Sequence, residues 1–80
     1  MSIDPERQKS IELATAFVAP RFRESLMGFG LSPRDEAFVG LRIVCRMVAE
    51  SYPREDANLV SKLYSDALLG LLKSYFDERH

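Results

Sequence analysis

The alternation of hydrophobic and polar residues along the chain predicts three helices and no strand. In three segments, 4–30, 32–51 and 53 to near the C-terminus, apolar residues return at the spacing of one helix face. No stretch alternates with a period of two residues over the length that a strand needs. We therefore predict an all-α protein whose helices are joined by two short turns.

The middle segment is the most apolar part of the chain. Between Ala37 and Ala49 the only charged residues are Arg42 and Arg46. At 3.6 residues per turn, one face combines Ala37, Phe38, Leu41, Val44, Cys45 and Val48, and Gly40, Ile43 and Met47 extend it. A helix that is apolar around so much of its circumference is typical of a position at the centre of a core. We therefore predict a compact three-helix unit with the second helix at its centre.

Residues suited to helix ends mark the boundaries of these segments. Asp4 before Pro5 combines an N-cap side chain with a proline at the first helical position. Ser32 and Asp35 have the spacing of a capping box. Pro53 ends the second helix, because the residue before a proline is disfavoured in the helical conformation.

Pro20 lies inside the first segment. Proline removes a backbone donor and clashes with the preceding turn, so the first helix is expected to be kinked or broken there. A kinked helix is the favoured alternative, because Ala19 is a poor N-cap for a new one. Gly28 and Gly30 follow, and either can adopt the left-handed conformation that ends a helix.

The third segment has a main apolar face, an apolar edge beside it and an opposite charged stripe. The main face consists of Val60, Tyr64, Ala67, Leu68 and Leu71, edged by Leu63 and Tyr75. The charged stripe is Lys62, Asp66, Lys73 and Asp77, in which residues four apart have opposite sign. The edge is Leu69, Leu72 and Phe76. It is either part of a core that extends further round the helix or a contact surface for another protein.

Length and cysteine content point to association between copies. The 80 residues are expected to form one helical domain, 1–80. A chain of this size buries roughly 60 to 65% of the surface of its unfolded form, so it is marginally stable alone. The single cysteine excludes a disulfide within the chain, and no metal-ligand cluster is evident. Oligomerisation is the remaining common support, so we predict a homodimeric helical bundle.

The candidate chemistry is sparse and argues against an enzyme. Arg42 and Arg46 lie one turn apart and form either an anion contact or the solvated edge of a helix, with Glu12 and Asp66 as possible partners. Cys45 lies on the densest apolar face and is expected to be a buried structural cysteine. No nucleotide-binding, metalloprotease or redox motif is present, and we predict no cofactor, metal site or catalytic residue.

These patterns favour a small cytosolic protein-interaction module: a homodimeric regulator, adaptor or chaperone-like protein. The candidate partner-binding residues are Leu69, Leu72, Phe76, Ile43 and Met47. The net charge of −1 argues against nucleic acid and anionic membranes as partners. The sequence has no signal-peptide pattern, no apolar run long enough for a membrane span and no pair of cysteines. We therefore expect the protein in the cytoplasm. The alternative is a DNA-binding helix-turn-helix regulator, with Ser51 to Glu55 as the turn.

Overall fold

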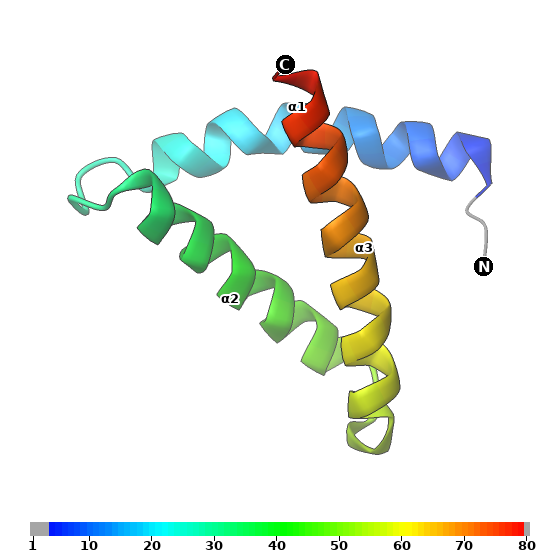
Figure 1. The fold of residues 1–80 in the computed structure, drawn as a ribbon. Helices are drawn as coiled ribbons and strands as arrows, with labels where there is room; N and C mark the ends of the chain where they lie inside the picture. The colour runs from blue at the N-terminus through cyan, green and yellow to red at the C-terminus, as the bar shows by residue number, and fades with distance from the viewer. Residues whose placement is uncertain (1–3, 80) are drawn as a thin grey trace. The chain divides into compact units, whose positions relative to one another are not determined.

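A computed structural model describes residues 4–79, and all regular structure in that range is helical. The elements in chain order are α1 (Pro5–Ser25), α2 (Pro33–Ser51), the short 3₁₀ helix η1 (Arg54–Asp56) and α3 (Ala57–Glu78), coloured from blue to red in Figure 1. The prediction of an all-α protein with three helices is confirmed. The chain divides into two structural units, residues 1–41 and 42–80, with the division inside α2.

The helix starts form as the sequence predicts. The backbone N–H of Glu6 donates to the Asp4 carboxylate at 2.9 Å, and Pro5 is the first residue of α1. At the start of α2, the N–H of Asp35 donates to the Ser32 hydroxyl at 3.2 Å, and the N–H of Ser32 donates to the Asp35 carboxylate at 3.4 Å. These reciprocal bonds satisfy donors that have no partner within the helix.

α1 runs through Pro20 without a break. Proline has no N–H to donate to the carbonyl of Ala16, one turn earlier. In the same turn the guanidinium of Arg21 donates to the carbonyl oxygen of Phe17 at 2.7 Å. A side chain therefore supplies a hydrogen-bond donor next to the backbone donor that proline lacks. Because α1 is continuous, the alternative of two separate helices is wrong.

The ends of α1 and α2 also follow the sequence pattern. Gly28 and Gly30 have positive φ angles of 96° and 71°, a conformation that costs a side chain about 1–2 kcal/mol and costs glycine almost nothing. α2 ends at Ser51, two residues before Pro53. The turn signals thus locate both connections correctly.

The compact core that the sequence predicts is absent from the single chain. Within residues 4–79, Val60 is the one buried hydrophobic side chain. α2, predicted to be central, buries none of its residues, and Leu41 and Val44 on its predicted core face are each 46% exposed. The apolar pattern therefore identifies faces that the chain does not cover by itself.

In the first unit, half-buried residues lie on both sides of the turn between α1 and α2. Phe22 comes from α1, Leu26 directly follows that helix, and Glu36, Val39 and Gly40 come from α2. The ring of Phe22 lies 3.6 Å from where a Cβ on Gly40 would be. An alanine side chain at this position would therefore be in ordinary van der Waals contact with the ring.

The second unit contains the buried Val60, with half-buried Val48 and Asp56. An aromatic pair joins the residue after α2 to α3: the rings of Tyr52 and Tyr64 meet edge to face, with centroids 6.2 Å apart and planes at 79°. Their hydroxyl oxygens are 3.4 Å apart. Edge-to-face pairing is a favoured aromatic geometry, and it holds α3 to the preceding turn.

Candidate protein-interaction surface

The main apolar face of α3 is covered only near its N-terminal end. Val60 is buried, at 7% exposure. Further along the same face, Leu68, Leu71 and Tyr75 are 49%, 56% and 54% exposed. The face predicted to be core is therefore an open apolar surface over most of its length.

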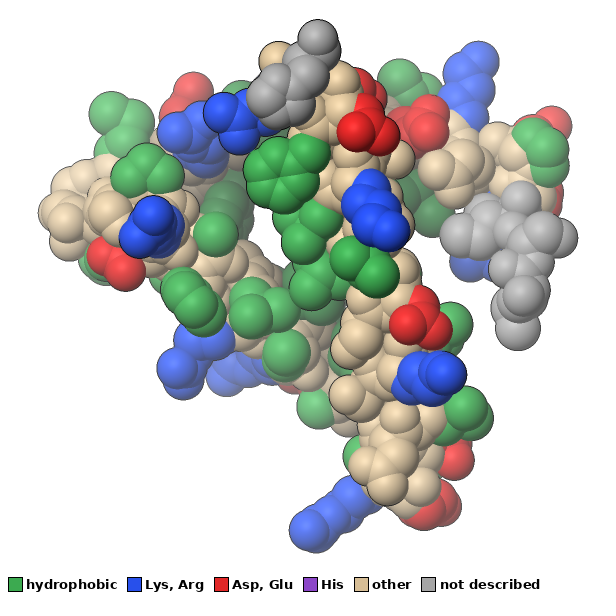
Figure 2. Space-filling model, in the orientation of Figure 1, with side chains coloured by type: hydrophobic (Ala, Val, Ile, Leu, Met, Phe, Trp, Pro, Cys, Tyr) green, Lys and Arg blue, Asp and Glu red, His purple; other side chains and the backbone are tan. Residues whose placement is uncertain are grey.

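The apolar edge of α3 is equally open. Leu69 is 55% exposed, and Leu72 and Phe76 are exposed as well. The sequence pattern separates this edge from the main face, but the exposed fractions do not, because neither surface is covered within the chain. Figure 2 shows hydrophobic side chains beside acidic and basic ones along α3.

The candidate residues on α2 are exposed too. Ile43 and Met47 are 44% and 61% exposed. Val39, which the predicted face omits, is in contrast half-buried. Helical spacing did not distinguish it, because its burial depends on how the turn at residues 26–32 brings α1 and α2 together.

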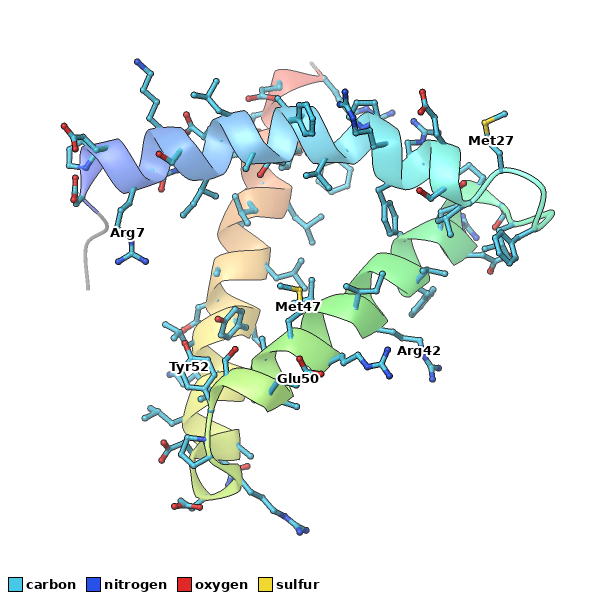
Figure 3. All side chains as sticks on the ribbon, turned by 180° about the vertical axis from the view of Figure 1, so that it is seen from behind. Arg7, Met27, Arg42, Met47, Glu50 and Tyr52 are labelled. Atoms are coloured by element: carbon cyan, nitrogen blue, oxygen red, sulfur yellow. The ribbon has the colours of Figure 1, made fainter. Side chains whose placement is uncertain are left out.

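Arg42 and Arg46 do not form a clamp around any group of the chain. Among the described residues the one ion pair joins Arg23 to Glu36 at 3.9 Å, so neither Arg42 nor Arg46 pairs with a carboxylate. Arg42 extends from α2 on a different side from Met47 (Figure 3). Both guanidinium groups are available to an external anion.

The charged stripe of α3 is solvated. Neither Lys62 with Asp66 nor Lys73 with Asp77 comes within ion-pair distance, and all four residues are exposed. Exposed pairs of this kind contribute little to stability. The stripe is therefore exposed like the apolar faces of α3, but its side chains are the ones that water solvates well.

Tyr64 is the one described side chain with a resolved change in acidity. The hydrogen bond with Tyr52 raises the pKa of Tyr64 above 10.0, and desolvation and the charge of an ionised Tyr52 act in the same direction. The phenol therefore stays neutral and hydrogen-bonded throughout the physiological range. The pair with Tyr52 thus joins α3 to the residue after α2.

Cys45 is exposed, so the expectation of a buried structural cysteine is wrong. Cys45 lies on the same face of α2 as Leu41 and Val44, and no other part of the described chain covers that face. The only histidine, His80, lies outside the described residues.

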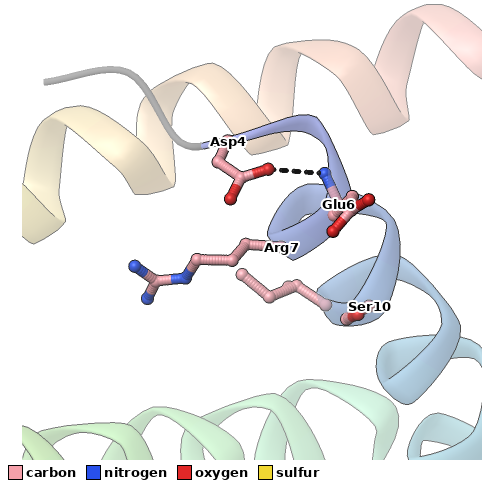
Figure 4. A pocket seen from close by; sticks show the side chains of 5 residues that line it. Asp4, Glu6, Arg7 and Ser10 are labelled. Atoms are coloured by element: carbon pink, nitrogen blue, oxygen red, sulfur yellow. Dashed lines mark hydrogen bonds between the residues drawn. The ribbon is translucent and has the colours of Figure 1, made fainter.

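The remaining surface features carry little chemistry. A shallow depression at the start of α1 is lined by exposed residues of that helix and its cap: Asp4, Glu6, Arg7, Ser10 and Ile11 (Figure 4). Residues 4–79 contain no group of three or more His, Cys, Asp or Glu that could hold a metal ion. Over the same range, no helix has both the length and the apolar character that crossing a membrane requires.

Comparison with known proteins provides no relative. No protein-family model, no curated protein and no solved structure matches this chain. The open apolar faces of α2 and α3 are therefore the basis for assigning a function.

Proposed function

We propose that the protein is a small, non-enzymatic interaction module that associates with itself as a homodimer and binds another protein through apolar helix faces. The observation that supports this proposal is the exposure of Leu68, Leu71 and Tyr75 on a face that is buried only at Val60. Burial of apolar area is worth about 25 cal/mol per Å², and soluble monomers rarely leave large contiguous apolar patches in water. A face of this composition therefore favours association.

Self-association would also stabilise a chain that is too small to form a large core by itself. The sole cysteine, Cys45, is free, and the described residues offer no metal site. A domain without either support depends on its core, and within residues 4–79 that core has one buried hydrophobic side chain. In a two-fold dimer, each copy covers the apolar face of the other with its own apolar face.

We propose that a different protein binds to the surfaces beside the dimer interface on the main apolar face of α3. Ile43 and Met47 on α2 and the edge of Leu69, Leu72 and Phe76 on α3 are the proposed contacts. Methionine suits such a surface, because its flexible side chain adapts to different shapes. Arg42 and Arg46 are free to bind a carboxylate or phosphate group at its rim.

The exposed free thiol of Cys45 favours a reducing compartment, the cytosol. Cys45 is accessible, and an exposed single cysteine in an oxidising compartment is prone to pair with another molecule. We therefore place the module in the cytosol. The acidic start of the third helical region supports a protein partner over DNA: Glu55 and Asp56 precede α3, and Lys62 is its first basic residue.

Sedimentation equilibrium over the micromolar concentration range tests the proposal. We expect a species of twice the 9.1 kDa chain mass, with its fraction rising with concentration. A single species at 9.1 kDa across the whole range would contradict homodimer formation.

A further inference from the structure

Four exposed or partly covered residues form a narrow seam along α3: Tyr64, Leu68, Leu71 and Tyr75. Their spacings along the chain are four, three and four residues. At 100° per residue they lie within about 60° of the helix circumference. Spacings of this kind are those of the a and d positions in paired helices, and this series is the same when read from either end.

The residues around the seam repeat in reverse order about the midpoint between Leu69 and Gly70. From residue 62 to residue 77, residues at equal distances on the two sides match in polar or apolar character, except for the innermost pair, Leu69 and Gly70. The matched pairs are Tyr64 and Tyr75, Ser65 and Ser74, Leu68 and Leu71, Leu63 and Phe76, and Ala67 and Leu72. The charges follow the same symmetry with opposite sign: Asp66 matches Lys73, and Lys62 matches Asp77.

We propose that two copies of the chain pair α3 against α3 in antiparallel orientation, with the two-fold axis beside the midpoint of Leu69 and Gly70. This inference rests on the proposed homodimer and specifies its interface. Tyr64 then meets Tyr75 of the second copy, and Leu68 meets its Leu71. The two-fold operation repeats both contacts, so the seam forms four apolar layers.

The pattern of charges along α3 matches between copies in the antiparallel orientation and not in the parallel one. In the antiparallel pair, Lys62 lies at the level of Asp77 of the second copy, and Asp66 lies at the level of its Lys73. In a parallel, aligned pair each of these residues would lie at the level of its own copy, so every level would carry like charges. Opposed helix dipoles favour the same orientation. These charges lie on the outer faces, too far apart across the pair to interact strongly in physiological salt, so the apolar layers supply the affinity and the opposed dipoles favour the orientation.

The main face is a better interface than the edge for the same two helices. Leu69 is about 140° round the helix from Tyr64 and lies close to the charged stripe. The seam, in contrast, continues from Val60, which the chain itself buries. The main apolar face of α3 thus packs within the chain at Val60 and, in the proposed dimer, against the second copy from Tyr64 to Tyr75.

Distances between spin labels on the two copies test the orientation and the register. In a Cys45→Ala background, single cysteines replace Lys62, Asp66, Lys73 or Asp77, all exposed and opposite the seam. Residue 62 is fifteen positions from 77, and 66 is seven from 73, so the axial offsets between equivalent labels are about 22 Å and about 10 Å at 1.5 Å per residue. We expect equal, longer distances at 62 and 77, and equal, shorter distances at 66 and 73.

Each other pattern contradicts the inference in a recognisable way. Four similar distances would indicate a parallel pair. Unequal distances at 62 and 77 would indicate an antiparallel pair in another register. Absence of any distance between labels, together with a sedimentation mass of 9.1 kDa, would reject the homodimer itself and therefore the proposed function.

A matched pair of substitutions checks the face. Leu68→Lys places a charge in the seam, and Leu69→Lys places the same charge on the neighbouring residue, which has a similar exposed fraction in the single chain. We expect Leu68→Lys to weaken dimerisation at least tenfold and Leu69→Lys to change it less than twofold. Equal weakening by both, with helicity retained in circular dichroism, would contradict the assignment of the seam. If Leu68→Lys loses helicity, the label distances in the unsubstituted seam decide the question.

Discussion

The guanidinium carbon of Arg21 lies 3.5 Å from the centre of the Phe17 ring, and the same side chain donates to the Phe17 carbonyl at 2.7 Å. Both contacts span the turn of α1 that contains Pro20. A cation above an aromatic face is stabilising, and the hydrogen bond occupies a carbonyl beside the interrupted part of the helix. Arg21 therefore reinforces α1 where its backbone bonding is weakest.

Arg21→Ala is expected to lower the free energy of unfolding by about 0.5–1 kcal/mol, the value of a cation–π contact at an exposed site. Chemical denaturation followed by circular dichroism measures the change. Arg7→Ala is the control, because Arg7 is an exposed arginine of the same helix with no aromatic ring beneath it. An equal loss in both variants would show that the Phe17 contact contributes nothing specific.

The tyrosine pair predicts a loss of stability in alkaline solution. Because the pKa of Tyr64 in the folded chain is raised above 10.0, the unfolded chain releases this proton first as pH rises. The stabilisation by the pair is therefore complete below pH 10.0 and disappears as pH rises through the pKa of the folded state. Ultraviolet titration of tyrosinate should show the Tyr64 midpoint falling toward 10.0 in Tyr52→Phe. A midpoint unaffected by that substitution would contradict the hydrogen bond as the main cause.

Gly40→Ala is expected to stabilise the chain. Alanine is favoured over glycine in a helix interior by about 0.5–1 kcal/mol. The new methyl group would lie 3.6 Å from Cζ of Phe22, an ordinary van der Waals distance. Thermal unfolding should therefore shift to higher temperature. A lower midpoint would mean that the approach of Phe22 leaves no space for a methyl group.

Two other glycines serve as controls for that measurement. Gly70→Ala should also be stabilising, since nothing lies within 4 Å of the added methyl group. Gly28→Ala should be destabilising by about 1–2 kcal/mol, because its φ of 96° is unfavourable for alanine. The three substitutions change one methyl group each and separate helix propensity from backbone conformation.

Duplex DNA is expected to bind weakly and without sequence preference. The net charge is −1, and Glu55 and Asp56 precede α3, where a recognition helix would present basic or amide side chains. Fluorescence anisotropy with random duplexes at physiological salt measures the affinity. Tight binding selective for one sequence would favour the helix-turn-helix alternative.

The sequence by itself determined the local structure. The cap of Asp4, the reciprocal bonds of Ser32 and Asp35 and the left-handed Gly28 and Gly30 form as their residue types predict. These features depend on atoms within a few positions along the chain, so residue identity and spacing are sufficient to define them. The favoured alternative of one helix through Pro20 is also what the structure has, while the contact of Arg21 with Phe17 beside it was not predicted.

Burial was decided by the tertiary structure. Helical periodicity correctly shows that Leu41, Val44 and Cys45 share an apolar face, yet all three are exposed, whereas Val39 is half-buried. Periodicity reports which side chains share a face, but burial depends on whether another element reaches that face. That distance is set by the turns and by close approaches such as Phe22 to Gly40, which no spacing within one helix encodes.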